Sequence, residues 1–260
     1  MSVDQNNTIG KPLERGSLAW FLDVFLHPKK LFSAIASIDK GVWLKPMLVL
    51  TALVLIFSIV AGPARLMDAQ MSINQPPEDF QYWSEEQQNQ FFEGQQAMQS
   101  PLFIYIFPLL GALIKLWLGW FIFGSVLYLL MTFIGSRQPQ VVYQNLVAWA
   151  SSPFILRYLI QIIYVISKRQ LIGASGLSGF ITAGQSGGLD LLRIILGLLD
   201  IYTLGFVALI LIGVPIVSGL KTKKALWVTI IALVIFAALV VVPGFFVSRF
   251  SGLGAIQPFF

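Results

Sequence analysis

Apolar residues gather into five long runs that are separated by short polar segments. A helix needs about 20 consecutive apolar residues to cross a hydrocarbon core of about 30 Å, and each run reaches or approaches that length. The second run is longer than this and contains Pro108, so we expect its true span to start near Phe107. The pattern predicts an all-α, polytopic membrane protein with five transmembrane helices, at 43–61, 102–134, 143–167, 189–220 and 225–247.

A different pattern precedes the first run. Residues 1–16 are polar and are predicted to be disordered. From 17 to 42, apolar residues recur at intervals of three and four, with a break near Pro28, which predicts one or two amphipathic helices in the cytoplasmic membrane interface. Two alternatives stay open: these helices pack against the protein's own spans, or they anchor the protein to the lipid surface.

The segment 62–100 is the one sizeable polar insertion in the predicted transmembrane domain, 43–247. Ser84 followed by Gln87 is a capping-box signature, and Glu85 and Glu86 favour a helix N-terminus. The pattern therefore predicts a short external helix from Glu85 to about Met98. Its aromatic residues suit the outer headgroup layer, the mouth of the bundle or a docked partner.

Lysine and arginine residues are divided unequally between the two ends of the predicted spans. Ten lie before the first run and in the second-to-third and fourth-to-fifth connections, whereas four lie on the opposite side. The positive-inside rule then predicts a cytoplasmic N-terminus and an external tail at 248–260 in a cell (plasma) membrane. The net charge of +5 does not indicate nucleic-acid binding, because no basic helix is interleaved with aromatic residues.

The residues that catalysis would need are missing from the sequence. The chain has no cysteine and one histidine, His27, which excludes thiol chemistry and a metalloprotease HExxH motif. Two GxSG matches at 173–179 resemble intramembrane serine proteases, but His27 lies on the opposite side of the predicted bundle, so no Ser–His dyad forms. We expect no enzyme activity, no cofactor and no metal site.

The most informative candidates are charged residues within the apolar runs. Charge is costly in hydrocarbon, about 2.5 to 3.5 kcal/mol on insertion scales, so it persists where it faces protein or water. Asp190 and Arg193 are spaced to pair on one helix surface. Asp200 continues their stripe and needs another partner. Counted from the outer ends of their runs, Lys115, Arg157 and Asp200 reach similar depths, so we expect an inward-facing cluster that joins the second, third and fourth spans. We favour a structural role for it over conduction.

Ser152 and Pro153 interrupt the third run. Proline removes a backbone hydrogen bond, which a serine hydroxyl or water can replace. The sequence therefore predicts a kink at Ser152. This kink could also shape a cavity beside Arg157.

Four segments together resemble the YIP family, the Ypt/Rab-interacting membrane proteins, in the short form found in prokaryotes. They lie at 21–32, 135–153, 199–213 and 219–225, within a resemblance that covers about 18 to 247. The resemblance implies a non-enzymatic, multi-pass helical protein that acts through partners: small GTPases and trafficking machinery, or ABC-type transporters and envelope functions in bacteria. The chain lacks the long N-terminal region of eukaryotic members, which argues against GTPase binding.

Together these observations predict a membrane accessory or scaffold protein that binds the lipid bilayer and other membrane proteins. The alternative is a transporter or channel subunit that uses the intramembrane Asp/Arg/Lys cluster as a substrate or proton site.

Overall fold

The protein is a bundle of five membrane-spanning segments, as predicted. The computed structural model describes residues 19–73, 77, 79–173, 176–180, 192 and 195–251, with side chains outside 72, 73, 180 and 243–251. Within these residues all regular structure is helical. The spanning elements are α3 (Leu44–Ile73), α5 (Phe107–Phe133), α6 (Gln140–Ala150) followed by α7 (Pro153–Lys168), α9 (Ile201–Ser218) and α10 (Thr222–Ser251).

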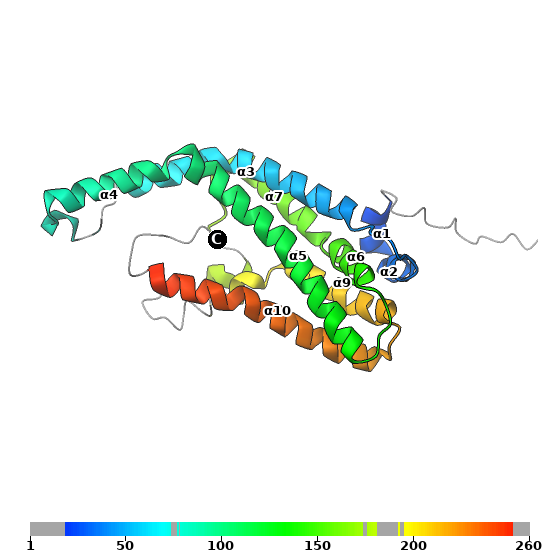
Figure 1. Cartoon of the computed structure of the whole chain (residues 1–260). Coiled ribbons are helices and arrows are strands. Elements are labelled where there is room, and N and C mark those ends of the chain that lie inside the picture. The colour runs from blue at the N-terminus through cyan, green and yellow to red at the C-terminus, as the bar shows by residue number, and fades with distance from the viewer. Residues whose placement is uncertain are drawn as a thin grey trace, which may run out of the picture.

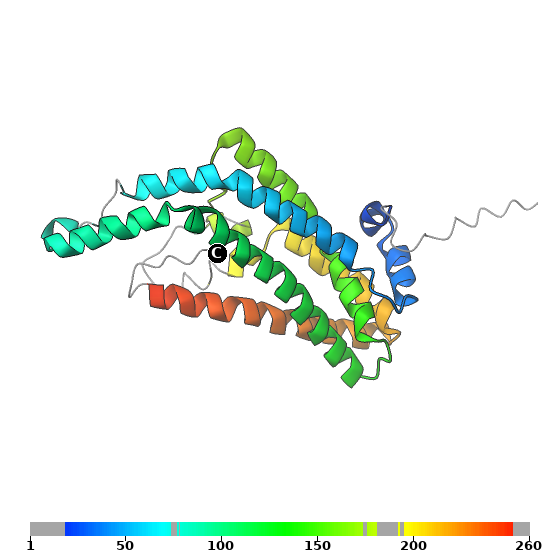
Figure 2. The ribbon, with the colours of Figure 1, turned by 45° about the horizontal axis from the view of Figure 1, so that its top comes forward.

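The helices are not all parallel. α3 packs along α7, and α9 packs against α6, α7 and α10. α5 begins beside α3 and crosses the bundle to reach α10, which both views show (Figure 1, Figure 2). α1 (Trp20–Leu26) and α2 (Pro28–Ala36) lie at one end of the bundle, and α4 (Glu85–Met98) projects from the other.

The first and the fourth spans differ most from the prediction. The first span does not end at residue 61: α3 continues through Pro63 to Ile73, because its extension packs against α4 and the segment that follows it. The fourth span does not run unbroken from 189 to 220. Residues 195–198 are helical, the chain leaves the helix at Leu199, and α9 begins only at Ile201. An apolar run does not reveal such a break, because both sides of it are equally hydrophobic.

The start of the second span agrees with the prediction. Residues Leu102–Ile106 form a π-helix, η2, and the regular helix α5 begins at Phe107 with Pro108 in its first turn. Proline is tolerated there because the first N–H groups of a helix have no intrahelical partner.

The centre of the bundle is α6, a short helix that other elements surround. All residues from Val142 to Ala150 are buried, including the polar Gln144 and Asn145. α1, α2, α3, α5 and α9 all pack against it. The hydrophobic core is therefore concentrated at the α6 end of the bundle. On α5, accordingly, the buried residues begin only at Phe123.

Asn145 forms hydrogen bonds with the chain segment that leads into the first span. Its Oδ1 accepts hydrogen bonds from the backbone N–H groups of Val42 (2.8 Å) and Trp43 (3.1 Å), and its Nδ2 donates to the carbonyl oxygen of Lys40 at 2.9 Å. The indole N–H of Trp149 donates to the carbonyl oxygen of Val42 at 3.2 Å. Two side chains of α6 thus satisfy backbone groups that would otherwise lack partners where α3 begins.

The two N-terminal helices contribute to the core. Trp20 and Val24 of α1 and Leu31, Phe32 and Ile35 of α2 are fully buried. Gly213 of α9 lets α2 approach closely, because a Cβ there would overlap the Leu146 side chain and lie 3.0 Å from the Phe32 ring. The sequence left open whether these helices pack against the spans or anchor to lipid. The buried faces of α1 and α2 pack against the protein's own spans.

The helix predicted within the segment 62–100, α4, has the predicted bounds and cap. Ser84 Oγ accepts from the N–H of Gln87 at 3.3 Å, and Gln87 Oε1 accepts from the N–H of Ser84 at 2.9 Å. No residue of α4 is buried. Phe80, Trp83, Phe91 and Phe92 stack with one another, with ring centroids 5.2 to 5.9 Å apart. The cap and this ring cluster stabilise a helix that has little other support.

Replacing Asn145 should destabilise the protein. Asn145→Ala removes both the acceptor and the donor that serve residues 40–43, so we expect a loss of about 2 to 4 kcal/mol in the free energy of unfolding. Thermal unfolding in detergent measures this loss. Thr132→Ala is the control, because the Thr132 hydroxyl bonds only the Tyr128 carbonyl of its own helix. Equal melting temperatures for the two variants would contradict the assigned role.

A pair of glycine substitutions tests the close approach of α2 to α9. Gly213→Ala should cost about 1 to 3 kcal/mol through overpacking. Gly111→Ala should be neutral or stabilise the protein by up to about 1 kcal/mol, because alanine favours helices and nothing lies within 4 Å of the added Cβ. The same unfolding assay compares them, and similar effects at both positions would argue against tight α2–α9 packing.

Candidate functional site

A break in the third span positions the first charged residue. α6 ends at Ala150 and α7 begins at Pro153, so the kink lies at Ser151 and Ser152. The Ser151 hydroxyl donates to the Val147 carbonyl at 2.8 Å, and the Ser152 hydroxyl donates to the Trp149 carbonyl at 2.7 Å. Pro153 packs against Gly205 of α9, where an added Cβ would lie 3.3 Å from the proline ring. The break directs α7 along the start of α9 and brings Arg157, one turn later, toward it.

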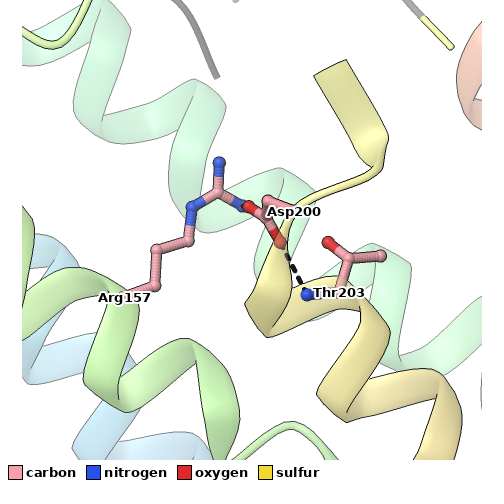
Figure 3. Close-up of polar contacts among 3 residues, drawn as sticks. All are labelled: Arg157, Asp200 and Thr203. Carbon is pink, nitrogen blue, oxygen red and sulfur yellow. Dashed lines mark hydrogen bonds and ion pairs between the residues drawn. The ribbon is translucent and has the colours of Figure 1, made fainter. Parts of the chain in front are cut away.

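Asp200 is the N-cap of α9, which corrects its predicted place midway along a continuous helix. Its backbone is extended, with φ −115° and ψ 165°, and its Oδ1 accepts a hydrogen bond from the N–H of Thr203 at 2.6 Å (Figure 3). Aspartate is among the best N-cap residues, because its carboxylate satisfies an N–H that has no intrahelical partner. This local bond is the physical reason for the break.

The carboxylate of Asp200 also binds Arg157. Arg157 Nη1 lies 3.2 Å from Asp200 Oδ2, so each oxygen of the carboxylate has its own partner (Figure 3). The Asp200 side chain is 11% exposed and that of Arg157 is 29% exposed. The pair joins α7 to the start of α9, and breaking it leaves a charge that is partly shielded from water.

Three other residues were predicted to belong to the charged cluster: Lys115, Asp190 and Arg193. Lys115 lies on α5 and is an exposed residue. Its contribution to the cluster stays a prediction. Asp190 and Arg193 lie outside the described residues, so their pairing also stays a prediction.

Sequence reasoning missed a second charged site in the spans, because it counted Arg65 only as an external charge. Arg65 Nη1 donates to the carbonyl of Ile104 at 3.1 Å and to that of Ser58 at 3.4 Å. Its guanidinium lies 5.9 Å from the centroid of the Phe57 ring. Gly62, one turn earlier, leaves room for the Tyr105 ring, which an added Cβ would overlap. Arg65 thus holds the π-helix η2 against α3. The only sequence signal was a glycine three residues before an arginine.

The second of the two GxSG matches lies in a described helical turn. Residues 176–180 form the 3₁₀ helix η3 (Gly176–Phe180), and the N–H of Leu177 donates to the Leu199 carbonyl at 3.2 Å. Gly176 has φ +57°, and an added Cβ would lie 2.8 Å from the same carbonyl oxygen. This segment therefore packs on the chain immediately before Asp200.

Two observations on the described residues bear on the chemistry considered in the sequence analysis. His27 lies between α1 and α2, at the opposite end of the bundle from η3. In the same part of the chain, no three histidine, aspartate or glutamate side chains come together as metal ligands would. The Arg157–Asp200 pair joins helices, and it is the candidate site of this protein.

A double-mutant cycle measures the coupling between Arg157 and Asp200. Asp200→Asn retains an oxygen that can cap α9, so it should cost less than Asp200→Ala, by about 0.5 to 2 kcal/mol. In an Arg157→Gln background the cost of Asp200→Asn should fall by about 0.5 to 3 kcal/mol. Unfolding in detergent provides the free energies, with Lys168→Gln as a control for the loss of an exposed cation. Additive effects would mean that the two side chains do not interact.

The comparisons with known proteins agree with the architecture. The family model for the Yip1 domain matches residues 22–242, from α1 into α10. No curated protein and no solved structure matches the chain. The matched residues include all five spans, the break before α7 and the cap of α9. The chain therefore belongs to the Yip1 domain family of membrane proteins.

Proposed function

We propose that this protein is a membrane accessory or scaffold protein that acts by binding other membrane proteins. The observation that carries the proposal is that polar side chains within the spans bond other parts of the same protein. Arg157 pairs with Asp200, and Arg65 bonds backbone carbonyls. These groups are engaged in holding helices together, as expected of a scaffold.

The proposed orientation places α1 and α2 in the cytoplasm-facing interface of a cell (plasma) membrane. Five spans put the two ends of the chain on opposite sides of the bilayer. Lysines and arginines are more numerous at the α1–α2 end, where the loops after α5 and α9 also lie, than at the α4 end. The positive-inside rule favours this end as cytoplasmic.

The exposed side of α5 is the surface we propose for partners in the membrane. Between Phe107 and Phe121 this helix buries no residue within the protein, and Ile114, Leu118 and Phe121 are each at least half exposed. A span with so little internal packing suits contact with another membrane protein. The YIP family suggests an ABC-type transporter or a small GTPase as the partner class.

A transporter or channel subunit is the alternative function. The observation in its favour is that the Arg157 side chain keeps 29% exposure beside Asp200. A substrate anion or a proton could reach a charged pair of this kind.

One experiment distinguishes the two functions. The tagged protein is purified from native membranes in a mild detergent, bound proteins are identified by mass spectrometry, and the pure protein is tested for ion and proton flux in proteoliposomes. We expect co-purification with an ATPase or GTPase component and no flux above that of empty liposomes. Ile114→Ala with Leu118→Ala should weaken this association, whereas Val234→Ala on the exposed face of α10 should not.

A defined flux result would contradict the scaffold role. Flux that the pure protein supports, and that Asp200→Asn abolishes while the melting temperature stays within a few degrees of the parent, would contradict the scaffold role. Lys168→Gln should leave any flux unchanged and serves as the control.

A further inference from the structure

The position of α1 relative to the membrane follows from its contacts with Trp149. The N–H of the Trp149 indole bonds the Val42 carbonyl, immediately before α3 begins at Leu44. Trp149 therefore marks the level at which the first span enters the bilayer. The rings of Trp20 and Phe21 lie 5.2 and 5.0 Å from the Trp149 ring. These contacts place α1 at that same level, beside the spans.

α1 has two apolar faces, and the protein covers only one of them. Trp20 and Val24 are fully buried against the bundle. On the outer side, Leu22, Phe25 and Leu26 are 67%, 45% and 69% exposed. Because the inner apolar face is already buried against the bundle, the outer one is removed from water only if lipid or another apolar surface covers it.

The outer side of α2 is different. Its exposed residues are polar, with Lys29 and Lys30 directly after α1 and Ser33 one turn later, whereas its buried residues are all apolar. The exposed surface thus changes within a few residues from three large apolar side chains to two lysines. This order matches the boundary between acyl chains and headgroups, and the lysines complement negatively charged headgroups.

We propose that α1 is an in-plane membrane anchor that inserts Leu22, Phe25 and Leu26 into an anionic leaflet, with Lys29 and Lys30 at its headgroups. The acidic residue of α1 does not oppose this arrangement. Asp23 is only 18% exposed, and its Oδ1 lies 3.5 Å from His27 Nδ1, so its carboxylate contributes little to the outer face. The proposal goes beyond the scaffold role and stands whether or not a protein partner exists.

The absence of cysteine in the chain makes a site-specific test possible. Phe25→Cys and, as the matched control, Ser33→Cys are each spin-labelled in the full-length protein. Both positions are exposed and neither contributes to the core. The proteins are placed in nanodiscs of phosphatidylcholine with about a third phosphatidylglycerol. The accessibility of each label to oxygen, which partitions into lipid, and to a water-soluble nickel complex is then measured.

We expect the label at position 25 to be several-fold more accessible to oxygen than to nickel, and the label at position 33 to show the reverse. Nickel accessibility at position 25 equal to that at 33 would overturn the proposal. So would low accessibility to both reagents, since that is the signature of burial against a second copy or another protein. Unchanged melting temperatures show that the labels leave the fold intact.

The choice of lipid is tested separately. In discs of phosphatidylcholine alone, or with Lys29→Gln and Lys30→Gln, nickel accessibility at position 25 should rise at least twofold. The same depth in every lipid and variant would overturn the requirement for anionic headgroups.

Discussion

Polar groups within a bilayer have to find their partners inside the protein, because hydrocarbon offers none. In the residues that the structure describes, buried polar side chains meet that constraint by bonding backbone groups and, at Arg157 and Asp200, by pairing with each other. One carboxylate oxygen of Asp200 accepts a hydrogen bond from the first turn of α9, and the other lies beside the guanidinium of Arg157. Asn145 serves the segment that leads into α3, and Arg65 serves carbonyls of α3 and η2. Each of these side chains fixes the place where a helix begins or changes direction.

The consequence is a bundle whose two ends differ. At the α6 end, α1, α2, α5 and α9 pack around a short, fully buried helix. At the other end fewer residues are buried, Arg65 links α3 to η2, and α4 projects away with no buried residue. This division suits a protein whose core keeps its shape while the less packed helices, α5 and α10, present apolar faces to lipid or to other membrane proteins.

The sequence predicted features that depend on local signals. The five spans follow from runs of apolar residues, and the start of α4 follows from Ser84 and Gln87, because a capping box lies entirely within four neighbouring residues. The break at Ser152 and Pro153 has the same local origin. The sequence also suggested Arg157 and Asp200 as partners, because a charge within a span needs one, but it could not give their geometry.

Features that depend on distant contacts were not predicted. The partners of Asn145 lie more than 100 positions earlier in the chain, and Arg65 bonds a carbonyl 39 residues away. Every residue type except proline has the same backbone donor and acceptor, so the sequence does not show which backbone group a distant side chain will bond. Asp200 was placed within a helix because its cap is surrounded by apolar residues. The packing of one apolar face of α1 against Trp149, which leaves the other face uncovered, likewise depends on a distant contact.

The most direct measurement of the central claim is the contact between Arg157 and Asp200 in the protein reconstituted in lipid. Solid-state NMR on samples labelled at arginine nitrogens and aspartate carboxyl carbons reports this contact through its dipolar coupling, and backbone chemical shifts report the start of α9. The account predicts a guanidinium–carboxylate contact that Arg157→Gln abolishes, consistent with 3.2 Å between Nη1 and Oδ2, together with extended shifts at Asp200. Helical shifts through residues 198–202, with no coupling between these groups, would contradict it.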